Sequence, residues 1–396
     1  MNVDEAPEAW LDTEWRDLRR RMVLRVGERS SDLGPEPLPV STSTYTDPVR
    51  FQAERRHIFG KVPLLAGISA ELPQPGSILL FDGAGPSIFI VRTENGSLNA
   101  FLNMCPHRGA RLVNDTRGRL SFVCPFHAWR FNAEGDLVQR PLNEAFLPSE
   151  GKPTLVRVPV AEKHGLIFVR CQPGTGEIDI DEFLGPMLPL IRSFDMAGAS
   201  LIKSDQLAVE TNWKLAVDIS CEGYHVPATH PTTLHPYLVP FLTIHDSFGS
   251  HHRFCGPSRH LEQCLGKPES DWPASNYSAV HYLFPNTILT YTDAIDGSVP
   301  VLAVNRSFPG KSVGEASIHY TTYKPSRASR ADNEGFLKLH EAVFNINRTE
   351  DIPTVTRIWN NYANLATPGK VVFGRNEMVL QNYHSDIARA IGMPLE

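Results

Sequence analysis

The spacing of hydrophobic positions changes along the chain. The segment 8–29 places apolar side chains at helical intervals and predicts an amphipathic helix. The stretch "GPEPLPVSTSTYTDP" that follows is rich in Pro, Ser and Thr and predicts a linker. From about residue 60, short apolar runs such as "SILLF", "SIFIVR" and "LIFVRC" alternate with turns that contain Gly, Pro or Asn. This alternation predicts a small all-β domain.

The pattern becomes mixed from about residue 175. Helix-like segments come first, at 182–194 and 209–226. Strand-like runs follow at 279–292, 300–308 and 316–323, and a helical C-terminal part spans 333–392. We therefore predict an α+β fold with an antiparallel sheet. We expect three parts: a β domain at 45–174, an α+β domain at 175–396, and an N-terminal helix and linker at 1–44 that pack on the α+β domain.

Composition narrows the class of protein. The length of 396 residues suggests more than one core, and 41% hydrophobic with 21% charged residues is typical of a globular protein. A net charge of -6 without a long Lys/Arg run argues against nucleic-acid binding. No apolar run is long enough to cross a bilayer, and the acidic N-terminus lacks a signal-peptide core. We expect a cytoplasmic protein, and six cysteines do not make a disulfide scaffold.

Two short motifs in the β region each combine one Cys with one His. "MCPHRGARLV" contributes Cys105 and His107, and "FVCPFHAW" contributes Cys124 and His127, while Gly109 permits a tight turn beside the first pair. Thiolate and imidazole are ligands of iron and zinc. Three interpretations follow: core residues without metal, a zinc site, or a Rieske [2Fe–2S] centre. Zinc sites usually pair like ligands, whereas two His and two Cys are the Rieske ligand set.

A second candidate site lies in "TNWKLAVDISCEGYHVPATHPTTL". Asp218, Glu222 and His225 fall at i, i+4 and i+7, so on the predicted helix they share one face. Pro227 should disturb this helix and let His230 turn back toward His225. Two His with one carboxylate are the ligands of non-haem Fe(II) oxygenases. The alternative is a structural histidine pair without metal.

The motifs resemble those of a known family. "CPHRGARL" and "CPFHAWRFNAEGDL", together with "NWK…D…E-G-Y-H…H", are similar to the α subunits of Rieske non-haem iron oxygenases, the aromatic-ring-hydroxylating dioxygenase family. The resemblance implies a small all-β Rieske domain and a larger helix-grip catalytic domain, in which helices pack on an antiparallel sheet. It also implies that Cys105 and Cys124 bind one iron of the cluster, and His107 and His127 the other.

The resemblance also implies a mononuclear Fe(II) bound by His225, His230 and an Asp from a distant acidic pair. The matching position in "NRTEDIPTV" is Asp351, with Glu350 as the alternative. Glu222 would then be a bridging carboxylate between His225 and His127 of the partner subunit, and Asp218 is the other candidate catalytic residue.

The implied activity is that of a terminal oxygenase that activates O₂ and hydroxylates an organic substrate, which we expect to be aromatic. The alternative is a monooxygenase or demethylase of a quaternary ammonium or methylated compound. A non-catalytic electron carrier is a third reading, but it leaves the second ligand set unexplained. "GAGPSI" lacks the third Gly of a dinucleotide fingerprint, so we expect electrons from a separate ferredoxin, an NAD(P)H-dependent reductase, or both. The family implies a homotrimer, with or without a β subunit.

Overall fold

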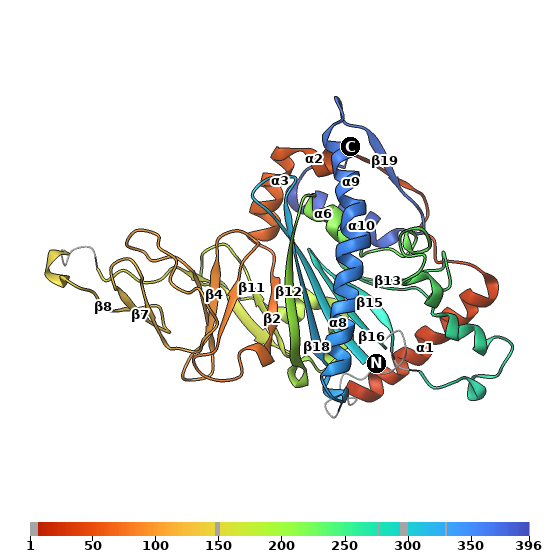
Figure 1. The fold of residues 1–396 in the computed structure, drawn as a ribbon, viewed down its shortest axis with the longest axis horizontal. Helices are drawn as coiled ribbons and strands as arrows, with labels where there is room; N and C mark the ends of the chain where they lie inside the picture. Colours follow the sequence, from red (N-terminus) through yellow and green to blue (C-terminus); the bar gives the residue numbers. More distant parts are fainter. Residues whose placement is uncertain (1–6, 147–150, 276, 294–299, 329–330, 396) are drawn as a thin grey trace. The chain divides into compact units, whose positions relative to one another are not determined.

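The computed structural model describes residues 7–146, 151–275, 277–293, 300–328 and 331–395 (Figure 1). The chain divides into two compact units. Unit 1 combines Met1–Glu54, Leu184–Asp195 and Ala199–Glu396, and unit 2 combines Arg55–Phe183 with Met196–Gly198. The boundaries expected from the sequence, at 44/45 and 174/175, stay a prediction.

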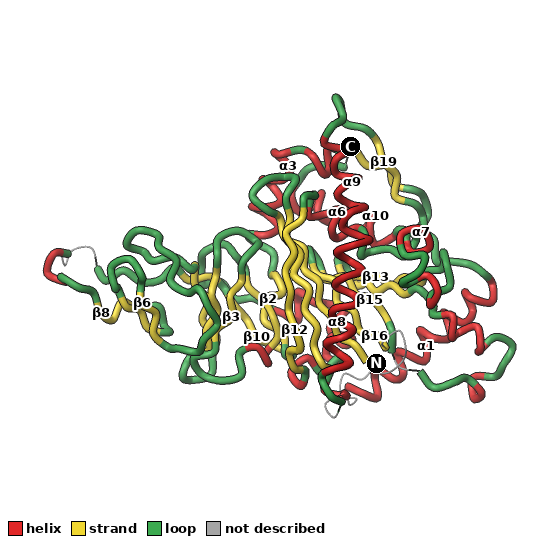
Figure 2. Tube along the Cα trace, in the orientation of Figure 1, coloured by secondary structure: helices red, strands yellow, loops and turns green. Residues whose placement is uncertain are grey.

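Unit 2 consists mainly of short antiparallel strands joined by turns (Figure 2). One sheet has the order β10-β11-β2, with β10 at Val160–Lys163, β11 at Leu166–Val169 and β2 at Leu64–Ile68. A second has the order β3-β4-β5-β9, at Ile78–Phe81, Ile88–Arg92, Leu98–Leu102 and Arg157–Val158. The third has the order β6-β7-β8, at Ser121–Val123, Arg130–Asn132 and Leu137–Gln139. These strands confirm the predicted all-β character of this region.

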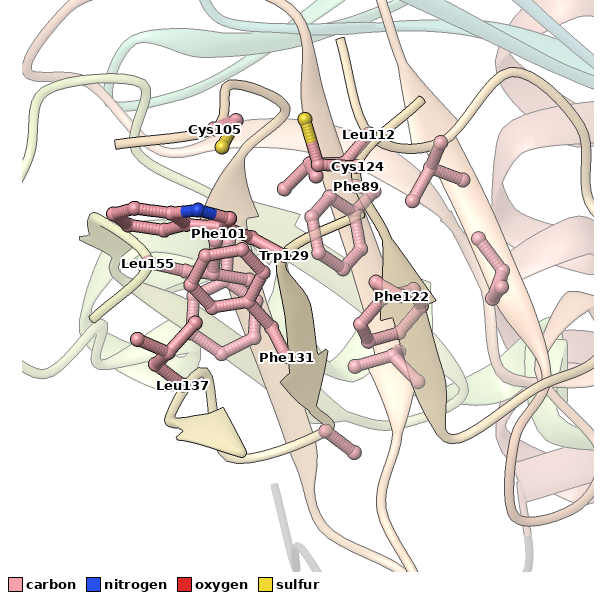
Figure 3. Packing of buried hydrophobic residues seen from close by; sticks show 14 residues of the cluster. Phe89, Phe101, Cys105, Leu112, Phe122, Cys124, Trp129, Phe131, Leu137 and Leu155 are labelled. Atoms are coloured by element: carbon pink, nitrogen blue, oxygen red, sulfur yellow. The ribbon is translucent and has the colours of Figure 1, made fainter. Parts of the chain in front are cut away.

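Aromatic side chains form the core beneath the two Cys/His motifs. Phe89 and Phe122 lie 4.7 Å apart between ring centroids, and Phe101 and Phe131 are fully buried beside them. Cys105 and Cys124 belong to the same cluster, and their sulfur atoms lie at one end of it in Figure 3. The core therefore supports both motif loops from below.

Unit 1 is built on a seven-stranded antiparallel sheet with the order β12-β18-β17-β16-β15-β14-β13. Its strands span Ser200–Val209 (β12), Ile244–Phe248 (β13), His251–Cys255 (β14), Ala279–Leu283 (β15), Thr287–Asp293 (β16), Pro300–Pro309 (β17) and Ala316–Lys324 (β18). The last four match the strand-like runs of the sequence. β12, β13 and β14 were not predicted, because polar and charged residues interrupt their apolar pattern.

One face of this sheet is covered by C-terminal helices. α8 (Glu334–Ile346), a π-helical turn (Asn347–Asp351) and α9 (Ile352–Ala363) form one continuous helical run that crosses the sheet in Figure 1. Tyr320 of β18 packs on His340 of α8, with ring centroids 5.1 Å apart. Tyr282 of β15 packs on Tyr383 of α10 (Met378–Ile391), at 5.2 Å.

The opposite face is covered by N-terminal and linking helices. Phe194, at the end of α5 (Leu188–Ser193), stacks on Tyr291 of β16 with 4.9 Å between centroids. α1 (Pro7–Glu28) contributes Trp15, whose ring lies 5.9 Å from that of Tyr277. The predicted N-terminal helix at 8–29 is thus confirmed. The segment expected to be helical at 182–194 contains α5 and most of α4 (Ile180–Leu184).

Two local expectations are wrong. The stretch expected to be a linker contains regular structure, because β1 (Leu38–Ser41) pairs with β19 (Lys370–Phe373), and α2 (Ser43–Thr46) and α3 (Pro48–Glu54) follow it. The expected helix at 209–226 is broken into α6 (Trp213–Asp218) and α7 (Val226–Thr229). Glu222 and His225 therefore do not share a helix face with Asp218, and their relation depends on the turn between the helices.

Candidate metal centres

The two Cys/His loops of unit 2 have the same backbone turn. In the first, the Cys105 N–H donates to the Ala110 carbonyl (2.8 Å) and the Gly109 N–H donates to the Cys105 carbonyl (2.9 Å). In the second, the Cys124 N–H donates to the Trp129 carbonyl (2.8 Å) and the Ala128 N–H donates to the Cys124 carbonyl (3.0 Å). In both loops the fourth residue after the Cys has a positive φ, +78° and +57°. The repeated turn presents each Cys in the same way.

The four side chains of these loops converge. Cys105 and Cys124 are 1% and 2% exposed, and the Nδ1 atoms of His107 and His127 lie 3.2 Å apart. The His107 ring stacks on Trp129 at an interplanar angle of 6°, which holds its orientation. Burial raises the pKa of Cys105 and lowers the pKa of His127. Two thiols and two imidazole nitrogens that face one another fit the Rieske ligand set.

We predict that Gly109→Ala destabilises unit 2 by about 1–2 kcal/mol, because φ of +78° is left-handed backbone. A Cβ at this position would meet no close neighbour, since the nearest atom is the Met104 sulfur at 3.8 Å. The cost should therefore come from the backbone alone. Thermal loss of the cluster absorbance measures it. Gly176→Ala is the control, because a Cβ there meets no close neighbour and Gly176 is not among the positive-φ residues. Equal midpoints for Gly109→Ala and the unmodified protein would contradict the prediction.

The second candidate centre lies in unit 1, where His225, His230 and Asp351 meet. One ligand atom of each lies within 4.8 Å of the other two. The Asp351 Oδ1 atom is 2.9 Å from His230 Nε2 and 3.7 Å from His225 Nε2. Metal–nitrogen and metal–oxygen bonds of about 2.1 Å allow two ligand atoms to lie up to about 4.2 Å apart, so both distances fit one ion. The buried Asp351 Oδ1 accepts no hydrogen bond from any described residue, as expected of a metal ligand.

Glu222 lies behind His225. Its Oε1 is 2.5 Å from His225 Nδ1, and its Oε2 accepts the backbone N–H of His225 at 3.0 Å. The Tyr224 N–H also donates to this carboxylate. A carboxylate at Nδ1 holds the proton there and leaves Nε2 free to face a metal. The turn between α6 and α7 thus places Glu222 beside His225 Nδ1 without the helix that the sequence predicted.

The acidic pair 350–351 is divided between two roles. Asp351 faces the metal position, whereas the Glu350 Oε2 lies 2.6 Å from His230 Nδ1 and accepts the Thr233 hydroxyl at 2.8 Å. Burial lowers the pKa of His230, but the two carboxylates outweigh it and the net pKa is raised. Sequence reasoning treated Glu350 only as an alternative ligand and missed Thr233. In the sequence, the spacing of three residues between His230 and Thr233 was the one sign that Thr233 could lie near the site.

Asp218 takes part in a different group of buried residues. Its carboxylate accepts hydrogen bonds from the hydroxyls of Tyr45 (2.6 Å) and Tyr383, and lies 2.9 Å from His384 Nε2. The structure does not include Asp218 among the three residues that could share an ion. The Asp218 group ties α6 to α2 and α10.

Family comparisons cover both units. Residues 196–393 match the model described as "Ring hydroxylating alpha subunit (catalytic domain)", and residues 63–159 match "Rieske [2Fe-2S] domain". The first match alone spans half of the chain. None of the helices in the described ranges has the length and hydrophobicity that a bilayer crossing requires.

The curated relatives include a monooxygenase subunit and a dioxygenase subunit. The chain is 31% identical over 199 residues to the "Glycine betaine monooxygenase oxygenase subunit" of Chromohalobacter salexigens, covering 49% of this chain and 43% of the relative. It is 30% identical over 231 residues to the "Biphenyl 2,3-dioxygenase subunit alpha" of Rhodococcus jostii, covering 56% of this chain and 46% of the relative. The chain thus spans slightly less than half the length of these two relatives.

Among solved structures, the fold is similar to that of the quaternary ammonium Rieske monooxygenase CntA in complex with L-carnitine. The TM-score is 0.73, and the match covers 91% of this chain and 96% of that one. At 20% sequence identity this similarity concerns the fold only.

Proposed function

Because this chain belongs to the family of Rieske non-haem iron oxygenase α subunits, we propose that it is the terminal oxygenase component of an electron-fed oxygenase. The chain has the two cofactor sites of that family, a Rieske [2Fe–2S] cluster and a mononuclear iron at His225, His230 and Asp351. The observation that carries the proposal is this second ligand set, because an electron carrier needs only the first. Bound, the cluster supplies single electrons and the mononuclear iron supplies a site for O₂ activation.

The residues of the two centres divide the work. Cys105 and Cys124 would hold one iron of the cluster and His107 and His127 the other, since the two thiols are buried together and the two Nδ1 atoms lie 3.2 Å apart. At the mononuclear site, three side-chain ligands leave the remaining positions open for O₂ and substrate. Glu222 holds the proton of His225 on Nδ1, and Glu350 holds that of His230. The Nε2 atom of each ring is then free to bind iron.

We further propose that Glu222 connects the centres of neighbouring subunits. Its carboxylate is 89% buried at the side chain, lies at His225 Nδ1, and would accept a second hydrogen bond from His127 of the partner subunit. This role requires an oligomer, for which the family implies a ring of three α subunits. We propose that Asp218 acts through α6 as a positioning residue, because its three partners are Tyr45, Tyr383 and His384.

Glu222→Gln should retain both metals but lower the single-turnover rate by about 10–100-fold, the usual cost of changing a residue behind a metal ligand. The amide keeps the size of the side chain and removes the charge that the bridging role needs. Iron content and stopped-flow reoxidation of the cluster measure the effect. Glu262→Gln, at an exposed carboxylate of unit 1, is the control. A normal single-turnover rate in Glu222→Gln would remove the bridging role.

For the substrate, we propose a quaternary ammonium or N-methylated compound that is monooxygenated. The names of the glycine betaine relative and of the structural neighbour with L-carnitine support this class over the aromatic substrate expected first. Glu222 supports it too, since by resemblance most family members carry Asp at this position and Glu occurs in those that oxidise quaternary ammonium compounds. Aromatic-ring hydroxylation is the second candidate, favoured by the biphenyl dioxygenase relative.

The iron–nitrosyl EPR signal of reduced protein separates these candidates. Nitric oxide takes the place of O₂, and three compound classes are added in turn: quaternary ammonium compounds, neutral arenes and aromatic carboxylates. We expect the quaternary ammonium class to change the signal, because that substrate would lie beside the iron. A change with arenes alone would favour the second candidate. Absence of any signal in iron-loaded protein would contradict the oxygenase proposal.

The electron donor is a proposed partner, namely a separate ferredoxin, an NAD(P)H-dependent reductase, or both. Arg108 and Arg130 are exposed next to the cluster loops, and Arg108 lies over the Phe126 ring at 4.9 Å. Arg111 forms an ion pair with Asp82 at 2.8 Å. Arg108 and Arg130 form no ion pair with a described residue and therefore suit an acidic carrier better than Arg111 does, since a paired cation attracts less.

A further inference from the structure

Two consecutive carboxylates face the two ring nitrogens of one histidine. Glu350 Oε2 lies 2.6 Å from His230 Nδ1, and Asp351 Oδ1 lies 2.9 Å from His230 Nε2. His230 itself is 1% exposed, so this contact is shielded from water. His225 differs, because its Nδ1 partner Glu222 comes from three residues earlier in the same turn.

The helix geometry explains how neighbours in sequence reach opposite sides of one ring. In a regular α-helix, consecutive side chains point about 100° apart. Residues 347–351 instead form a π-helical turn between α8 and α9, which widens the backbone at this point. Such turns are frequent at functional sites because they redirect side chains without ending the helix. Here the wide turn lets Glu350 and Asp351 both reach His230.

Resting on the proposed oxygenase function, we propose that Glu350 is a positioning residue of the mononuclear centre. It holds the proton of His230 on Nδ1 and so directs the Nε2 lone pair to the metal, while Asp351 binds the metal itself. The nitrogen that carries the hydrogen bond decides which one is free to ligate.

Thr233 completes the arrangement. Its hydroxyl donates at 2.8 Å to the same Oε2 that faces His230 Nδ1, so one oxygen accepts two hydrogen bonds. The Glu350 side chain is 24% exposed, yet this double contact specifies its direction. Since Glu350 and His230 are 120 residues apart, the contact ties the helical run α8–α9 to the loop after α7. Among the described residues, the hydrogen bonds of Glu222 stay within its own turn, so they do not make this link.

The test uses variants of the full protein with reconstituted cluster. Glu350→Ala removes the acceptor and should weaken mononuclear Fe(II) binding by about 10–100-fold in competition with a chelator. Its iron–nitrosyl EPR line should also broaden, because the His230 ring is no longer held in one orientation. Glu350→Gln keeps an acceptor oxygen without the charge, and should recover a narrow line and part of the affinity. Thr233→Val should lie between Glu350→Gln and the unmodified protein.

The controls separate this inference from the proposed function. Glu334→Gln removes an exposed carboxylate of α8, whose side chain is 74% accessible, and should change neither readout. Unchanged cluster absorbance shows that unit 2 is folded in each variant. Unmodified iron affinity and line width in Glu350→Ala would overturn the role of Glu350 even if the enzyme is active. Iron binding that depends on Glu350 in a protein that oxygenates no substrate would support the inference and overturn the function. Failure of the unmodified protein to bind mononuclear iron would overturn both.

Discussion

His225→Ala should abolish product formation while leaving the colour of the Rieske cluster unchanged. His225 Nε2 lies 3.7 Å from the Asp351 ligand atom, and it is one of three side chains that can hold the mononuclear iron. Changing even a supporting residue around a metal costs about 10–100-fold in affinity or activity, so losing a ligand should cost more than about 100-fold. Iron should fall from about three to about two per chain, since the two-iron cluster has its own ligands.

The measurement combines iron content, cluster absorbance and product yield. His260→Ala removes an exposed histidine of the same unit and should leave all three unchanged. Because the cluster ligands lie in unit 2 and His225 lies in unit 1, cluster colour reports folding independently of the mononuclear site. If His225→Ala keeps both colour and activity, the iron site is assigned to the wrong residues.

Lys214→Met should destabilise unit 1 by about 3–5 kcal/mol, the usual cost of removing one partner of a buried ion pair. Lys214 and Glu54 are 1% and 0% exposed, and the Lys214 ammonium lies 2.6 Å and 2.7 Å from the two carboxylate oxygens. Burial lowers the pKa of Lys214, which shows how much the charge depends on its partner. Without Lys214, the Glu54 carboxylate keeps the Trp213 N–H at 2.8 Å and Arg50 at 3.6 Å, which compensate only in part.

Thermal unfolding followed by tryptophan fluorescence measures this loss, with cluster absorbance as the separate report on unit 2. The double variant Glu54→Gln/Lys214→Met removes both charges, keeps an oxygen that accepts the Trp213 N–H, and should be less destabilised than Lys214→Met alone. Lys338→Met breaks an exposed pair with Glu334 and should cost less than about 1 kcal/mol. A double variant as unstable as the sum of both single changes would show that packing, and not the buried charge, is responsible.

The sequence alone was sufficient to predict a Rieske cluster. The proposed ligands come from two short segments, and each Cys lies within three residues of its His. Ligand type and spacing are local properties, so they can be read without knowing the fold. The same holds for His225 and His230, which are five residues apart, and for the all-β and α+β character of the two regions.

Other features depended on pairing between distant segments. The strand β1 is a strand only because it pairs with β19, more than 300 residues later, and its own composition indicates a linker. The helix expected at 209–226 has a suitable apolar pattern, but it breaks between α6 and α7. Asp218 is turned toward Tyr45 and Tyr383, contributed by α2 and α10. Local propensity cannot anticipate such contacts, because tertiary packing overrides it.

The acidic pair shows this difference most clearly. The sequence, with the family resemblance, determined that a carboxylate near position 350 completes the iron site. It favoured Asp351 by resemblance and kept Glu350 as the alternative, since neighbours in a chain have the same local environment. Only the tertiary structure divided them, because the π-helical turn at 347–351 directs Asp351 to His230 Nε2 and Glu350 to His230 Nδ1. Local patterns report which chemical groups are present, whereas their orientation is a property of the packed fold.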